Sequence, residues 1–70
     1  QYTIVVANLL SDIIEKNAAA IASLVEKGGT LIASGIHDRW AQGIIALMQK
    51  YCTLVDKNIM DEWHCLVFKK

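Results

Sequence analysis

Residues 2–7, Tyr-Thr-Ile-Val-Val-Ala, form a short run of mostly β-branched side chains in which apolar and polar residues do not alternate. This pattern is typical of a strand that is buried on both faces of a sheet, as in parallel sheets. A parallel neighbour is reached only through a crossover connection, usually a helix. The segment therefore predicts an α/β fold in which helices and strands alternate along the chain.

The residues that follow fit this alternation. Apolar side chains recur at helical spacing over residues 11–27, and Gly28-Gly29 is a typical stop signal for such a helix. Residues 30–34, Thr-Leu-Ile-Ala-Ser, predict a second buried strand, and residues 35–37 predict a loop. Asp38 is then expected to cap a second helix. The apolar stripe of that helix consists of Trp40, Ile44, Leu47, Met48 and Tyr51.

Two further strands are predicted near the end of the chain, at residues 52–59 and 62–69. The short turn between them makes this pair antiparallel. Pairing Ile59 with Glu62 would place the two cysteines of the chain roughly 13 Å apart along the strands, which is too far for a disulfide. We therefore expect two buried free thiols, as in a protein of the reducing cytoplasm.

The predicted order is β-α-β-α-β-β, an α/β arrangement with three parallel strands and one antiparallel C-terminal strand. The 70 residues suffice for one small domain only. Seven basic and seven acidic residues balance, which gives no sign of nucleic-acid binding, and no apolar stretch is long enough for a membrane span. The first strand would be a bare, uncharged sheet edge through which the isolated chain should associate. This edge, and a start at Gln1 beside an apolar run, lead us to expect a missing N-terminal half.

Ligands of open α/β sheets bind outside the carboxyl ends of the parallel strands. Two segments are expected to face each other there, Asn8-Leu9-Leu10 and Gly35-Ile36-His37. The Asn8 amide offers a donor and an acceptor, although asparagine is also common where a chain merely turns. His37 is a candidate acid or base, and the alternative of a solvent-exposed loop histidine stays open. The scattered cysteines and histidines have no metal-site spacing.

The other conspicuous residues have structural interpretations. His64 lies in the middle of the last predicted strand, where a packed or hydrogen-bonded histidine is expected. Trp63 and Phe68 are expected to point to opposite faces of that strand and to belong to the core. Gly28-Gly29 ends a predicted helix instead of opening one, so it is not a dinucleotide-binding glycine loop.

Three segments carry a resemblance to a known family: V-V-A-N-L-L at residues 5–10, G-G-T-L-I-A-S-G-I at residues 28–36, and E-W-H-C-L-V-F-K at residues 62–69. In this combination they resemble the methyltransferases that modify large-subunit ribosomal protein eleven, and the resemblance covers the whole chain. It implies a partial Rossmann-like, S-adenosylmethionine-dependent methyltransferase sheet, of which residues 1–70 would be the C-terminal part. The family's glycine-rich cofactor loop would lie upstream of these residues.

The resemblance also implies roles for the two facing segments. The family's cofactor-contacting asparagine matches Asn8, which we expect to serve catalysis and cofactor binding, whereas Leu9, Leu10, Gly35, Ile36 and His37 are expected to bind substrate. Asn8-Leu9-Leu10 lacks the prolines and the aromatic residue with which related enzymes hold planar amides or bases. This departure favours an aliphatic amine, either a lysine side chain or the N-terminus of a ribosomal protein. Methylation of a small-molecule or nucleic-acid amine, and a non-catalytic interaction module, remain as alternatives.

Overall fold

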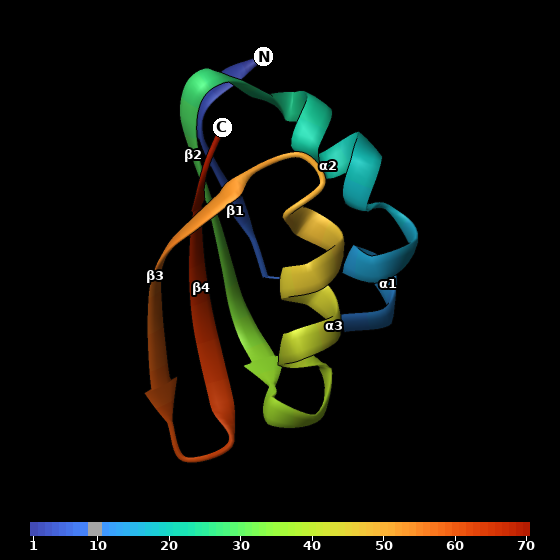
Figure 1. The fold of residues 1–70 in the computed structure, drawn as a ribbon, viewed down its shortest axis with the longest axis vertical. Helices are drawn as coiled ribbons and strands as arrows, with labels where there is room; N and C mark the ends of the chain where they lie inside the picture. Colours follow the sequence, from blue (N-terminus) through green and yellow to red (C-terminus); the bar gives the residue numbers. More distant parts are fainter. Residues whose placement is uncertain (9–10) are drawn as a thin grey trace.

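The computed structural model describes residues 1–8 and 11–70 of the chain. The four strands form one sheet, and the helices lie together on one face of it (Figure 1). Within this described part, none of the helices has the length and apolar character needed to cross a membrane. In chain order, the elements are β1 (Tyr2–Ala7), α1 (Ser11–Lys16), α2 (Ala18–Leu24), β2 (Val25–His37), α3 (Asp38–Met48), β3 (Thr53–Met60) and β4 (Trp63–Lys69).

The sheet is mixed, with the strand order β1-β2-β4-β3. β1 and β2 are parallel, whereas β4 is antiparallel to both β2 and β3. The predicted α/β class and the antiparallel C-terminal hairpin are confirmed. The predicted set of three parallel strands needs a correction, because β4 lies between β2 and β3 and leaves β1–β2 as the one parallel pair of the described sheet. β3 still points in the same direction as β2, since both are antiparallel to β4.

The single helix predicted over residues 11–27 is two shorter helices, interrupted at Asn17. The backbone N–H of Asn17 donates to the carbonyl oxygen of Ile13 (3.1 Å), and its side-chain amide donates to the same oxygen (2.8 Å). α1 therefore ends at an asparagine whose side chain bonds a backbone carbonyl of the helix. Asparagine side chains compete in this way with the backbone hydrogen bonds that would continue a helix. α2 then ends at Leu24, and the β-branched Val25 is already part of β2.

The pair Gly28-Gly29 lies inside β2, so its interpretation as a helix stop was wrong. The register between β1 and β2 shifts at this point, and residues 26–29 lie opposite Thr3 alone. Gly28 has a φ of 84°, which glycine adopts without strain. The two glycines therefore allow a bulge that brings the second strand alongside the first before regular pairing resumes at Thr30.

At its other end β2 continues to His37, so the loop predicted for residues 35–37 was also wrong. Ile36 and His37 pair with the first two residues of β4, and this pairing extends the strand beyond Gly35. The helix cap shifts accordingly. His37 is the N-cap of α3, and Asp38 is the first helical residue.

The β3–β4 hairpin turns at Asp61-Glu62, and its first pair is Met60 with Trp63. The predicted register, with Ile59 opposite Glu62, was therefore wrong, because Ile59 pairs with His64. Asp61 has a φ of 55°, a conformation that suits a tight two-residue hairpin turn. Both cysteines of the chain are free thiols.

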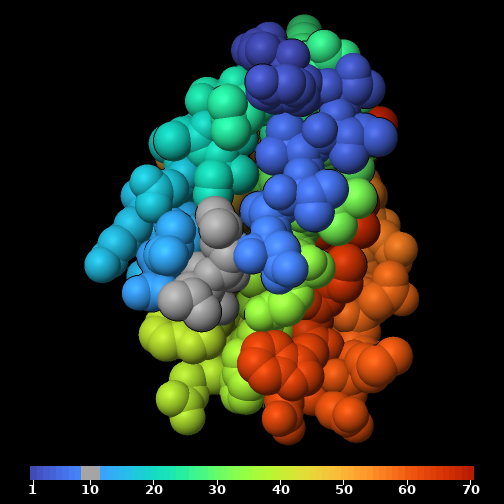
Figure 2. Space-filling model, turned by 180° about the vertical axis from the view of Figure 1, so that it is seen from behind, coloured from blue at the N-terminus to red at the C-terminus, as the bar shows by residue number. Residues whose placement is uncertain are grey.

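The hydrophobic core lies between the sheet and the helices. Leu66 and Phe68 of β4, Leu31 of β2 and Ile44 of α3 are almost completely buried in it. The opposite face of the sheet is open, and Figure 2 shows β1 running across it with β2, β4 and β3 beside it. Large apolar side chains of β1 are exposed to solvent: Tyr2, Ile4 and Val6.

Gly43→Ala is expected to stabilise the protein. Gly43 lies within α3, and a Cβ there would meet nothing within 4 Å. Alanine should therefore raise the free energy of unfolding by about 0.5–1 kcal/mol through its better helix propensity. Gly29→Ala is the matched control, because its Cβ would lie 2.9 Å from backbone oxygens of Thr3 and Glu26 and should destabilise the protein. Urea denaturation measures both effects, and a destabilising Gly43→Ala would contradict the prediction.

Candidate functional site

The carboxyl ends of β1 and β2 bring Asn8 and Gly35 together. The strands pair up to Ala7 with Ala33, Asn8 follows directly, and both Asn8 and Gly35 are exposed. A Cβ on Gly35 would lie 3.1 Å from Oδ1 of Asn8. A side chain at position 35 would therefore crowd the Asn8 carboxamide.

Gly35 belongs to a bulge in β2. Ala33 pairs with Leu66 and Ile36 with His64, so Ser34 and Gly35 together lie opposite one residue of β4. Gly35 has a φ of 72°, in the left-handed region that favours glycine. Bulges of this kind redirect a strand and the side chains beside it. In this protein the bulge lies next to Asn8.

The remaining predicted site residues have different surroundings. Leu9 and Leu10 lie outside the described residues. Ile36 is fully buried and its side chain belongs to the hydrophobic core. His37 is partly buried, and its Nδ1 accepts a hydrogen bond from the backbone N–H of Arg39 (3.1 Å), which caps α3. This bond occupies one of the two ring nitrogens that an acid or base would use.

Trp63 was expected in the core, but it is 49 % exposed at the same edge of the sheet. Its ring meets that of His37 edge to face, with centroids 5.2 Å apart and an interplanar angle of 89°. A hollow of about 390 Å³ lies beside it, lined by Gly35, Trp63 and residues 58–60 and 64–65. The sequence did contain a signal for this exposure, because Trp63 directly follows the hairpin turn. At such a turn the strands extend beyond the helices that cover the middle of the sheet.

His64 is buried and hydrogen bonded, as expected. Its Nε2 lies 2.8 Å from Oδ1 of Asp38, a partner that the sequence did not indicate. The backbone N–H of Asp38 also donates to the carbonyl oxygen of Glu62 (2.7 Å). The start of β4 is thus joined to the start of α3 through Asp38.

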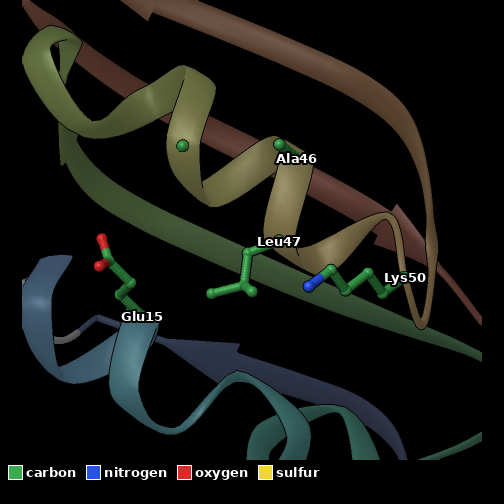
Figure 3. A pocket seen from close by; sticks show the side chains of 5 residues that line it. Glu15, Ala46, Leu47 and Lys50 are labelled. Carbon is green, nitrogen blue, oxygen red and sulfur yellow. The ribbon is translucent and has the colours of Figure 1, made fainter.

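A second hollow, of about 330 Å³, lies between α1 and α3 and has a different character. Glu15, Leu47 and Lys50 line it together with the small residues Gly43 and Ala46. Figure 3 shows Glu15 and Lys50 coming from opposite sides of this groove, with Leu47 between them. The groove is on the helical side of the molecule, and Asn8 and Gly35 are not among its lining residues.

The thiol of Cys52 is distant from the candidate site. Burial raises its pKa, and the positive charge of Lys70 partly opposes this effect. Cys52 directly precedes β3, at the end of the sheet opposite to the β3–β4 turn and His37. A raised pKa makes a thiol a poorer nucleophile at neutral pH, which is typical of a structural cysteine.

The residues at the carboxyl ends of β1 and β2 can orient a ligand. Asn8 supplies an amide oxygen and an amide N–H, Trp63 and Met60 supply apolar surface, and His37 is engaged in capping. Among the residues described, no group of three or more His, Cys, Asp or Glu side chains is arranged to hold a metal ion. Asn8 is not among the residues that line the hollow beside Trp63, and Gly35 lies between the two, since it lines the hollow and a Cβ on it would be 3.1 Å from Oδ1 of Asn8.

Comparison with known proteins identifies the family. No curated protein matches the chain. The family model described as ribosomal protein L11 methyltransferase (PrmA) matches residues 1–70, which is the whole chain. The segments that carry the resemblance in the sequence include Asn8, Gly35 and Trp63, which the fold gathers at one edge of the sheet. The chain therefore belongs to the ribosomal protein L11 methyltransferase family.

Proposed function

We propose that this chain is the C-terminal part of the catalytic domain of an S-adenosylmethionine-dependent methyltransferase that acts on amines of a ribosomal protein. The observation that carries the proposal is the Asn8 carboxamide at the carboxyl end of β1, lying against the side-chain-free Gly35. This is where ligands of α/β sheets bind. The name of the family supports a ribosomal protein, L11, as the methyl acceptor.

The uncovered face of the sheet supports the domain assignment. All-parallel sheets are normally covered on both faces, and in this mixed sheet β1, β2 and β3 all point in the same direction. Here β1 exposes apolar side chains on the face opposite to the helices and also forms an edge of the sheet. An N-terminal half that covers this face and pairs with β1 would complete a Rossmann-like domain and contribute the glycine-rich cofactor loop. The free thiols fit a protein of the reducing cytoplasm.

The site fits one rim of a cofactor pocket, because a side chain at position 35 would occupy the space beside Asn8. When bound, S-adenosylmethionine supplies an electrophilic methyl group on a sulfonium. The protein has to bring a neutral amine to that carbon with its lone pair correctly aimed. Oδ1 of Asn8 can accept a hydrogen bond from an N–H of the amine and so fix the direction of its lone pair, a contribution of positioning rather than of acid–base chemistry.

Trp63 supports an aliphatic amine as the acceptor. The exposed indole and the neighbouring Met60 line the hollow next to Gly35. The methylene stem of a lysine can pack on such a surface while its amine reaches towards Asn8. Trp63 is also an aromatic residue on which a planar group could stack, so a nucleic-acid or small-molecule amine is the second candidate.

Two measurements test this proposal. In isothermal titration calorimetry, residues 1–70 alone should bind S-adenosylmethionine weakly or not at all, because they supply one rim of the pocket, whereas the full-length protein should bind it. With labelled S-adenosylmethionine, the full-length protein should methylate ribosomal protein L11, and mass spectrometry should locate the methyl groups on lysines or the N-terminus. Micromolar binding by the isolated chain would contradict the domain assignment, and unmodified L11 would favour another amine or a non-catalytic role.

A further inference from the structure

The pair formed by His64 and Asp38 combines a buried and an exposed partner. His64 is only 4 % exposed, whereas the side chain of Asp38 is 71 % exposed, and Nε2 and Oδ1 are 2.8 Å apart. The buried imidazole therefore reaches from the sheet to the solvent-exposed first turn of α3. A buried histidine with an outward carboxylate partner is constrained in both position and ring orientation.

The surroundings of His64 also determine which nitrogen carries the proton. Within the described residues, Nδ1 of His64 is buried without a hydrogen-bond partner. A proton on Nδ1 alone would leave a buried donor unmatched and would turn the lone pair of Nε2 towards a carboxylate oxygen, and both features are unfavourable. In the neutral ring the proton is therefore on Nε2, and this N–H donates a hydrogen bond to Oδ1 of Asp38.

This bond lies beside the bulge that holds Gly35 against Asn8. His64 pairs with Ile36, the first residue of β2 after the bulge. Two further contacts join the same strand ends: the ring contact of His37 with Trp63, and the bond from the Asp38 N–H to the Glu62 carbonyl. Together these contacts fix the register between β2 and β4 on the C-terminal side of the bulge. They therefore also fix the position of Gly35 within the bulge.

We propose that His64 is a positioning residue of the methyltransferase site. Its Nε2–H, held by Asp38, fixes the bulge at Ser34-Gly35 and, through Gly35, the direction of the Asn8 carboxamide. His64 belongs to the lining of the hollow beside Trp63, but its side chain is only 4 % exposed, so in this role it acts through Gly35 and Asn8 and not by touching substrate or cofactor. The inference rests on the proposed function, because it concerns how Asn8 is aimed at the acceptor amine.

The test uses the full-length enzyme with L11 as acceptor. Asp38→Ala and His64→Leu should each lower kcat by about tenfold with little change in KM, a smaller loss than the roughly 10²-fold cost of misplacing a reacting group, because Asn8 itself is retained. His64→Gln, whose amide places an N–H near the position of Nε2, should recover most of the rate. Asp12→Ala is the matched control, an exposed acidic residue in the first turn of α1, and should leave kcat unchanged. If His64→Leu does not fold, Asp38→Ala still decides, because its side chain is exposed.

A double mutant separates positioning from a general loss of structure. In an Asn8→Ala background, Asp38→Ala should lower kcat by no more than about twofold, because the group that it positions is gone. Independent losses that multiply would overturn the proposal, as would an unchanged kcat in both single variants.

One readout does not depend on methylation. In NMR spectra of the full-length protein, the side-chain amide signal of Asn8 should shift in Asp38→Ala and stay in place in Asp12→Ala. The imidazole nitrogens of His64 should show a protonated Nε2. An enzyme that methylates no amine but passes these tests would refute the proposed function and leave the positioning role standing. An Asn8 amide signal that does not shift in Asp38→Ala would refute the positioning role alone.

Discussion

Asn8→Ala in the full-length enzyme is expected to lower the rate of methyl transfer by about 10²-fold or more, the scale of effect expected when a reacting group is misplaced. Asn8 is exposed at the end of β1, and its carboxamide lies against Gly35 rather than in the core. Its removal should therefore change the free energy of unfolding by only about 1 kcal/mol, as for a lost turn hydrogen bond. Steady-state kinetics and thermal unfolding together measure this contrast.

Two further variants sharpen the test of Asn8. Asn8→Asp keeps an acceptor oxygen but loses the amide donor and adds a negative charge, so a rate that falls as far as in Asn8→Ala would show that the donor or the neutral charge matters. Asn17→Ala is a matched control, since Asn17 is an exposed asparagine whose amide closes α1. It should lower stability by about 1 kcal/mol and leave the rate unchanged. If Asn8→Ala unfolds the protein or keeps the rate within about threefold, Asn8 is a turn residue and does not position the acceptor amine.

The parts of the fold that follow from local chemistry were predictable. The β-branched run of residues 2–7, the helix that begins at Asp38 and the C-terminal hairpin appear where the sequence indicates them. The errors arise where tertiary pairing decides. Gly28-Gly29 looks like a helix stop, yet it serves a bulge next to β1, and Gly35 looks like part of a loop, yet β4 pairs with the residues beyond it. The structural role of these glycines can be predicted only when the strand that pairs with them is known.

The candidate site shows the same division. The general rule that ligands bind at the carboxyl ends of parallel strands brought Asn8 and Gly35 to attention, and the structure places them in contact. The same rule could not find Trp63 or the partner of His64. Both depend on β4 lying beside β2, a strand order that residue spacing along the chain does not specify. His37 was considered as an acid or base, but its Nδ1 caps α3.

Residues 1–70 in isolation are expected to self-associate. β1 is an edge strand whose only neighbour in the described sheet is β2, so its outer backbone donors and acceptors are free to pair with another chain. The uncovered face adds an apolar row in which Val6 pairs with Ile32 and Ile32 with Val67. An apolar face beside an open edge favours association of the isolated chain. Sedimentation velocity should show dimers or larger species that increase with concentration.

A single charge should distinguish association through the sheet from non-specific aggregation. Val6 is 63 % exposed, so Val6→Lys leaves the core intact and places a positive charge on the edge strand, as native edge strands do. This variant should shift the isolated chain towards monomer. Leu24→Lys is the matched control, because Leu24 is an exposed apolar residue at the end of α2 and not part of β1, and its replacement should not reduce association through the β1 edge. A wild-type chain that stays monomeric at high concentration would show that the sheet needs no further cover, which would remove the main support for a missing N-terminal half. Equal effects of the two lysines would instead mean that general surface hydrophobicity, and not the β1 edge, drives the association.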